Sequence, residues 1–204
     1  LDKSKTQLKA DYYTDNIFKG DNAMISKSIS SECTFKSIDI TGLCNAADVT
    51  ETLNQYPYWI QMYLPETLLI PPQKPDAETI NTVNITINII RKEVIKTPIS
   101  PEENLEGKIL TGRKLIVEGN VCQKVVYTAD EPQQSVHSAE FSVPFSAYIV
   151  VPKEYTFNSV IFDSLDINYE VNSCIEDLSV ELLDPRTILK RVTLLLYAVP
   201  KETF

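Results

Sequence analysis

Histidine, glycine and basic residues are scarce in this sequence. Its 204 residues include 1 histidine and 5 glycines, and 28 acidic residues outnumber 19 basic ones, giving a formal net charge of −9. A nucleophile paired with histidine could use only His137, which lies in an alternating, strand-like stretch without a nucleophile-elbow glycine pattern. We therefore expect no catalytic residues and no enzyme activity.

Motifs that hold phosphates or metals are also missing. Neither glycine fingerprint of a nucleotide-binding loop occurs, and no lysine and arginine cluster interleaved with aromatic residues offers a phosphate-reading surface. The four cysteines are widely spaced, unlike the close pairs of zinc sites. The segment with Asp166, Asn168 and Glu170 lacks the central glycine of a calcium-binding loop. The alternation of these three residues predicts the solvent-exposed face of a strand. We expect no cofactor, no metal and no nucleic-acid partner.

Long hydrophobic runs are absent as well. The longest unbroken apolar run covers residues 194–199, far short of the roughly 20 residues that a membrane-spanning helix needs. The first residues lack the hydrophobic core of a signal peptide. We expect a soluble chain with no membrane partner and no secretion signal.

The residues that are abundant favour β-structure. Valine, isoleucine, threonine, tyrosine and phenylalanine are plentiful, and polar and apolar residues alternate far more often than they follow helical spacing. The predicted strands cover residues 59–70, 83–90, 109–117, 121–128, 136–151, 160–171, 175–183 and 188–198. This spacing predicts an all-β fold, an antiparallel β-sandwich of about eight strands.

The distribution of proline divides the chain. All 12 prolines lie at or after Pro57, whereas residues 1–56 are rich in serine, threonine and asparagine. We expect an N-terminal arm over residues 1–56 and a β-sandwich domain over residues 57–204. Alternating runs at residues 34–36 and 37–40 predict short strands in the arm, and residues 48–56 predict a brief helix capped by Asp48.

One local turn is predicted inside the sandwich. Alternating apolar residues flank Glu118, Gly119 and Asn120 on both sides, and glycine is suited to the positive backbone angle of a tight turn. We expect a β-hairpin that reverses at Gly119.

The cysteines are the remaining chemical feature. Strand alternation places Cys122 on the face of Lys124, and it places Cys174 on the face of Asn172 and Glu176, so both are expected to point outward. Two hypotheses stay open. The four cysteines could be reduced and partly buried thiols. Alternatively they are cross-linking residues, with Cys33 or Cys44 of one chain bonded to Cys122 or Cys174 of another.

Several stretches carry a family resemblance. They include LTGRKLIVEG at residues 110–119, VVYTAD at residues 125–130 and PFSAYIVVP at residues 144–152. Shorter matching stretches lie at residues 59–61, 70–71, 74–76, 136–139 and 175–177. From about residue 57 to residue 199 the chain resembles the SPOCS domain, a family of spore-coat-associated domains. We expect the residues at these positions to determine the fold. Trp59, Tyr127 and Phe145 are expected as core anchors, which are large aromatic side chains buried in the core.

The resemblance implies a structural role and no catalytic residues. Well-known members join this domain to a C-terminal LysM module that docks on another coat protein, and this chain reaches Phe204 without one. The resemblance therefore favours a building block of the spore surface, in the coat, the exosporium or an appendage fibre, made in the mother-cell cytoplasm. We expect it to assemble with itself, an open sheet edge accepting a neighbour's N-terminal strand and disulfides locking the contact. The alternative is a non-polymerising adaptor that recruits other spore coat proteins.

Overall fold

The structure is a computed structural model that describes residues 39–41 and 43–201. Most of the predicted arm lies outside these residues, including Cys33 and the alternating run at residues 34–36. Within the described residues, the chain forms strands, one α-helix and one 3-10 helix. Their bounds, in chain order, are β1 Asp39–Thr41, α1 Ala46–Gln55, β2 Trp59–Leu69, β3 Ala77–Ile99, β4 Thr111–Ala129, β5 Val136–Val150, β6 Glu154–Phe157, β7 Val160–Asp163, η1 Ser164–Asp166, β8 Asn168–Asp184 and β9 Thr187–Lys201.

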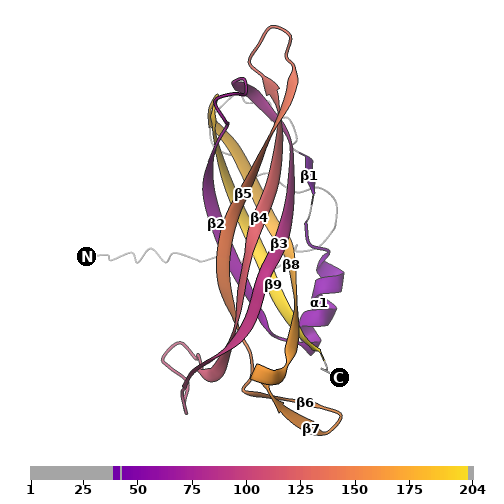
Figure 1. The fold of residues 1–204 in the computed structure, drawn as a ribbon, viewed down its shortest axis with the longest axis vertical. Helices are drawn as coiled ribbons and strands as arrows, with labels where there is room; N and C mark the ends of the chain where they lie inside the picture. Colours follow the sequence, from indigo (N-terminus) through magenta and orange to yellow (C-terminus); the bar gives the residue numbers. More distant parts are fainter. Residues whose placement is uncertain (1–38, 42, 202–204) are drawn as a thin grey trace, which may run out of the picture.

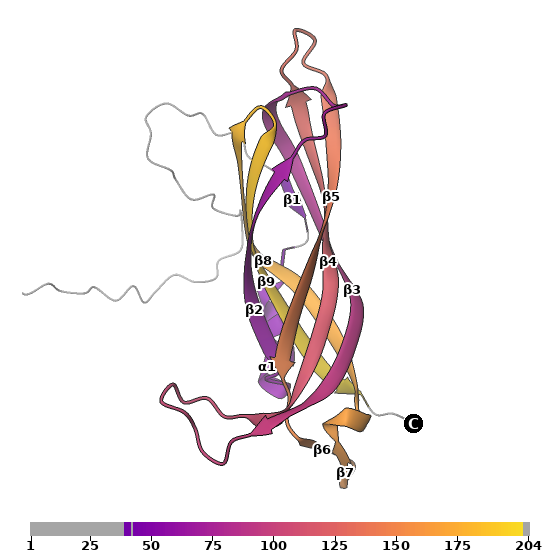
Figure 2. The same cartoon turned by 60° about the vertical axis from the view of Figure 1, so that its left-hand side comes forward.

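The long strands form two twisted sheets that lie face to face (Figures 1 and 2). One sheet has the strand order β1-β3-β4-β5 and the other has the order β2-β9-β8. All pairs among these strands are antiparallel except β1 with β3, which is parallel. Edge strand β2 contacts β5, and edge strand β8 contacts β3. The predicted antiparallel β-sandwich is therefore confirmed.

The core lies between the sheets and follows the alternation of the strands. On β9, residues Ile188, Val192, Leu194, Leu196 and Ala198 are fully buried, and β4 contributes every second residue in the same way. Burial of such aliphatic side chains is the main stabilising contribution to a fold of this kind. No helix in this part of the chain is long and apolar enough to cross a membrane.

Two of the three expected core anchors are confirmed. Tyr127 is fully buried and its hydroxyl donates a hydrogen bond to the Pro75 carbonyl at 3.1 Å, and Phe145 is 7 % exposed. The prediction for Trp59 is wrong, since its side chain is 47 % exposed. Odd-numbered residues of β2 face away from the core, and residue 59 shares that parity.

The predicted hairpin at Gly119 is also wrong. β4 runs without a break through Gly119, which pairs with Ile89 of β3 and with Phe145 of β5. A Cβ atom at this position would lie 2.5 Å from the Asn88 carbonyl oxygen and 2.8 Å from Cζ of Phe145. Glycine is therefore required here because two neighbours approach the backbone closely, not because the chain turns.

Two smaller predictions change in detail. The predicted strand at residues 160–171 is divided between β7, η1 and β8. The predicted helix exists as α1, but its N-cap is Asn45, whose side chain accepts a hydrogen bond from the Ala47 N–H at 3.2 Å. Asp48 lies within the helix instead. The predicted exposed strand face is confirmed for Asn168 and Glu170, which lie on either side of buried Tyr169 in β8, whereas Asp166 lies in η1.

Candidate functional site

The segment before α1 joins the edges of both sheets. β1 pairs with residues 82–84 of β3, at the edge of one sheet. Two residues later, Leu43 forms a parallel bridge with Ile175 of β8, and the Cys44 N–H donates to the Ile175 carbonyl at 2.8 Å, at the edge of the other sheet. We call residues 39–41 and 43–55, which comprise β1, Cys44 and α1, the clasp. It spans the side of the sandwich where β3 and β8 meet.

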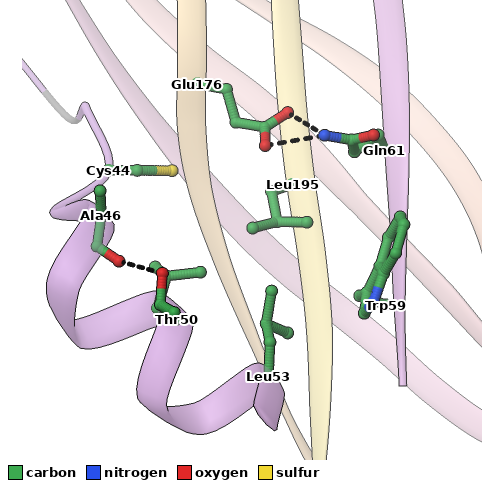
Figure 3. A pocket seen from close by; sticks show the side chains of 9 residues that line it. Cys44, Ala46, Thr50, Leu53, Trp59, Gln61, Glu176 and Leu195 are labelled. Carbon is green, nitrogen blue, oxygen red and sulfur yellow. Dashed lines mark hydrogen bonds between the residues drawn. The ribbon is translucent and has the colours of Figure 1, made fainter. Parts of the chain in front are cut away.

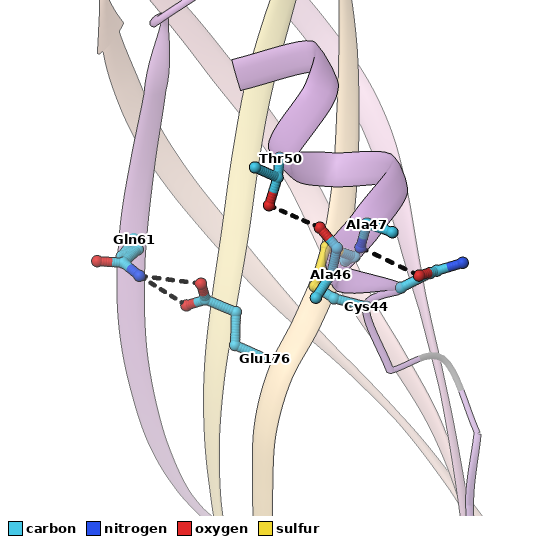
Figure 4. Close-up of a disulfide and its surroundings, with 8 residues drawn as sticks. Cys44, Ala46, Ala47, Thr50, Gln61 and Glu176 are labelled. Atoms are coloured by element: carbon cyan, nitrogen blue, oxygen red, sulfur yellow. Dashed lines mark hydrogen bonds between the residues drawn. A yellow bond between two sulfur atoms is a disulfide. The ribbon is translucent and has the colours of Figure 1, made fainter. Parts of the chain in front are cut away.

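A disulfide fixes the clasp to β8. Cys44 and Cys174 are bonded, with Cα atoms 5.0 Å apart, and Figure 4 shows the bond beside the start of α1. Both residues were expected as cross-links between chains, and the structure pairs them within one chain instead. The reason is local, because the hydrogen bond from Cys44 to Ile175 places Cys44 next to Cys174. Cys174 lies on the outer face of β8, as its parity predicts, and the clasp half-buries it.

Helix α1 lies on the outer face of the second sheet. Its side chain Leu53 points toward Leu195 of β9, which is only 4 % exposed (Figure 3). Residue 195 faces away from the sandwich core, so the packing of α1 explains its burial. Inside the helix, the Thr50 hydroxyl donates to the Ala46 carbonyl at 2.8 Å.

An apolar groove remains between α1 and β2 (Figure 3). Its volume is about 390 Å³. Leu195 forms its floor, the exposed ring of Trp59 stands on one side and Leu53 on the other. At one rim the Gln61 amide donates to both carboxylate oxygens of Glu176, at 2.9 and 3.0 Å. The groove is lined mainly by apolar side chains, as ligand-binding pockets usually are.

The two other sheet edges carry prolines at their centres. Pro65 lies in the middle of edge strand β2, opposite Arg191 of β9. Pro144 lies in the middle of edge strand β5, opposite Asn120 of β4. Proline is tolerated in an edge strand when its missing N–H would have pointed away from the sheet. Each of these edges therefore lacks one donor that an added strand would need.

Cys122 and His137 lie outside this site. Cys122 is a half-buried free thiol on the outer face of β4, near the exposed ion pair between Lys124 and Glu140. The ring of His137 contacts the Ser135 hydroxyl at 3.0 Å and stacks against Tyr127 with 6.0 Å between centroids. The described residues contain no group of three or more histidine, cysteine or acidic side chains that could hold a metal ion.

One ion pair links β4 to the start of η1, at the end of the sandwich near β6 and β7 (Figure 1). Buried Arg113 of β4 forms an ion pair with Asp163, whose carboxylate also accepts the Leu165 N–H at 2.9 Å and caps η1. The hydrogen bonds from Arg113 and Leu165 lower the pKa of Asp163 to about 2. Next to it, the Ser164 hydroxyl lies 3.0 Å from the Tyr169 hydroxyl and donates to the Pro152 carbonyl. These contacts hold η1 in place.

Part of the chain matches a known protein family. Residues 76–183 match the family described as SipL, SPOCS domain. The match covers more than half of the chain and extends from the start of β3 into β8, so it includes Gly119, Phe145 and Arg113. No curated protein and no solved structure matches the chain.

Proposed function

The chain belongs to the SipL SPOCS-domain family, a structural domain associated with the spore coat, and we propose that it is a self-assembling structural subunit of the bacterial spore surface. The spore surface here means the coat, the exosporium or an appendage fibre. The observation that carries the proposal is the clasp, a short segment that adds to the edges of both sheets. A segment bound in this way can also bind the same edges of a neighbouring copy.

The choice of edge follows from the prolines. β8 contains no proline, and β3 contains none before Pro98 near its end. Proline therefore removes no donor from the central part of either strand, and the clasp pairs with three residues of β3 and bridges one of β8. The edges of β2 and β5 are each interrupted at Pro65 and Pro144. The side of β3 and β8 is thus the better acceptor for the N-terminal segment of a neighbour.

If neighbouring copies exchanged their clasps, the assembly would use the same contacts that each clasp makes within its own chain. Residues 56–58 connect α1 to β2 outside any helix or strand, so this linker can redirect the clasp toward a second copy. Cys44 of one chain would then bond to Cys174 of the next, which restores the expected intermolecular disulfide with the same partners. Cys33 and Cys122 are additional cross-linking candidates. In this proposal residues 1–56 act as the arm and residues 57–204 as the sandwich.

The proposed partners are copies of this chain and other spore coat proteins. The net charge of −9 disfavours nucleic acid and anionic membranes as partners. We propose synthesis in the mother cell, followed by assembly on the spore surface, with no catalytic role.

The adaptor alternative is supported by a different observation. The groove between α1 and β2 offers Trp59, Leu53 and Leu195 to an apolar side chain, and Gln61 and Glu176 form a polar pair at one rim. Exposed aromatic residues beside an apolar pocket are typical of recognition sites. In this alternative the chain stays monomeric or dimeric and holds another coat protein in the groove.

Negative-stain electron microscopy and sedimentation of the full chain test the proposal. We expect fibres or sheets from the oxidised protein, and shorter or fewer assemblies after reduction. A variant that lacks residues 1–44 should remain dispersed, whereas Cys122→Ser should assemble if the clasp alone is sufficient. Dispersed particles from the full chain under both redox conditions would overturn self-assembly and favour the adaptor. In that case Trp59→Ala should abolish the capture of a coat protein from spore extracts.

A further inference from the structure

A polar cluster lies inside the apolar core of the sandwich. Lys190 of β9 is 1 % exposed and Gln123 of β4 is 3 % exposed. The side chain of Glu66 of β2 lies between them and is 12 % exposed. Lysine, glutamate and glutamine are rarely buried so deeply unless a specific contact compensates for the lost hydration. The cluster therefore needs an explanation that general packing does not provide.

The three side chains meet at a single oxygen atom. Glu66 and Lys190 are direct partners in the register of β2 and β9, and Lys190 Nζ forms an ion pair with Glu66 Oε2. From the facing sheet, Gln123 Nε2 donates to the same oxygen at 3.3 Å. Among the described residues, the Gln123 Oε1 atom has no hydrogen-bond partner, and Lys190 Nζ has none beyond its ion pair. The Lys190 amine and the Gln123 amide thus both contact the same carboxylate oxygen of Glu66.

The neighbours of the cluster on both sheets are apolar and buried. The neighbours that share the inner face of β4, Val121 and Val125, are buried, and so are Ile188 and Val192 on β9. Burial lowers the pKa of Lys190. In such an environment the neutral pair of an amine and a carboxylic acid becomes accessible, because a dry interior disfavours the separated charges. A neutral amine is a nucleophile, whereas an ammonium group is not.

We propose that Lys190 and Gln123 form an intramolecular amide cross-link between the two sheets, with Glu66 as the proton-transfer group. This inference is independent of the proposed assembly, because it concerns bonds within one chain. It assigns a covalent bond to Lys190 and Gln123 and a proton-transfer role to Glu66.

The reaction balances without an oxidant or a second substrate. Glu66 takes a proton from the Lys190 ammonium group, and the Nζ lone pair attacks Cδ of Gln123. A half-turn of the amide brings its carbonyl oxygen to Glu66, which protonates it and later takes the second proton from Nζ. Glu66 gives this proton to Nε2, and the Cδ–Nε2 bond breaks with loss of ammonia. As the carbonyl group re-forms, Glu66 takes the hydroxyl proton and passes it to the ammonia, which departs as ammonium. The products are a secondary amide and one ammonium ion, and Glu66 returns to its carboxylate form.

Enclosure favours this reaction and protects its product. The three groups are oriented by two facing sheets, which removes the entropic cost of bringing them together. Apolar walls limit the access of water, so hydrolysis of the Gln123 amide cannot compete effectively. Once formed, the bond ties β4 to β9 at the centre of the sandwich, where the described residues have no disulfide.

Intact mass spectrometry of the denatured full chain tests the proposal directly. After reduction of disulfides, we expect a mass about 17 Da below that of the sequence, which corresponds to one ammonia. After thiol alkylation and trypsin digestion, residues 115–124 should appear joined to residues 187–191, with cleavage blocked at Lys190. A wild-type chain that shows the full sequence mass and separate peptides would overturn the proposal.

Variants distinguish this bond from other losses of ammonia. Lys190→Met, Gln123→Leu and Glu66→Gln should each show the full mass calculated from the variant's own sequence, without the loss of ammonia. Of these, Glu66→Gln keeps the size of the side chain. Gln61→Leu is the matched control, because Gln61 also donates to a carboxylate but lies on the exposed outer face. This control should retain the lower mass. A lower mass that persists in Gln123→Leu would place the lost ammonia elsewhere and would refute the cross-link.

Discussion

Cys44 is bonded to Cys174 although 130 residues separate them in the sequence. The bond is not isolated, since the neighbouring hydrogen bond from Cys44 to the Ile175 carbonyl fixes the clasp at the same edge. Backbone contacts with β3 and β8 and the packing of α1 also hold the clasp. The position of the clasp should therefore depend on the oxidation state of these two cysteines.

The first prediction concerns the removal of this disulfide. In the double variant Cys44→Ser and Cys174→Ser, the sandwich should still fold, with stability reduced by about 2–4 kcal/mol because a long loop is no longer closed in the unfolded chain. Denaturant unfolding measures this loss. Hydrogen exchange should show that amides of α1 lose protection before those of β4 and β9. Cys122→Ser is the control and should change neither quantity, while full protection of α1 in the double variant would contradict the prediction.

The second prediction concerns Gly119. Alanine at this position would bring its Cβ within 2.5 Å of the Asn88 carbonyl oxygen and 2.8 Å of the Phe145 ring, so Gly119→Ala should destabilise the domain by about 1–3 kcal/mol. Urea unfolding of four proteins in a double-mutant cycle with Phe145→Leu provides the test. The smaller side chain at residue 145 relieves one of the two contacts, so Gly119→Ala should be less harmful in that background. Equal effects in both backgrounds would show that the ring is not the obstacle.

Gly119 also shows how far the sequence could predict the fold. The alternation of buried residues continues through Val117, Gly119 and Val121 without a change of parity. A hairpin of two residues would have required a reversal, so the continuous pattern could have identified one long strand. Glycine instead was interpreted by its most frequent role, a turn. The contact that requires it comes from Phe145, and single-sequence patterns cannot reveal a neighbour on another strand.

Strand positions and the sandwich class were predictable because alternation depends on each strand alone. The candidate site was not, because it depends on which strands become neighbours. Cys174 was correctly placed on the outer face of its strand, but its partner could not be chosen among the other cysteines. Similarly, nothing in the sequence brings Glu66 and Gln123 together, since they belong to strands of facing sheets.

The third prediction is a dependence of stability on pH through Asp163. Its pKa is about 2 in the folded chain, against an ordinary value of 3.8, because Arg113 and the Leu165 N–H bond to its charged form. A folded pKa below the unfolded one contributes stability above pH 3.8, and this contribution disappears as the pH falls toward 2. The difference in unfolding free energy between wild type and Asp163→Asn should therefore shrink between these values. The exposed pair of Glu106 with Lys108 supplies a control, because Glu106→Gln should have little effect. A difference that stays constant with pH would show that the charge of Asp163 is not responsible.

The last prediction tests whether the edge prolines direct assembly to the side of β3 and β8. Pro144→Val adds an N–H to the free edge of β5, where an added strand could accept it, and valine is also favourable in strands. Light scattering should therefore detect irregular association of Pro144→Val that does not weaken on reduction, in contrast to assembly through the clasp. Ser146→Val is the matched control, because residue 146 is exposed on the same strand, has the same parity as residue 144 and already carries an N–H. If both variants associate equally, strand propensity is the cause and the missing donor at Pro144 does not protect the edge. If only Pro144→Val associates, the lack of a donor at Pro144 is what keeps β5 from pairing, and the acceptor side of the sandwich is set by the positions of its prolines.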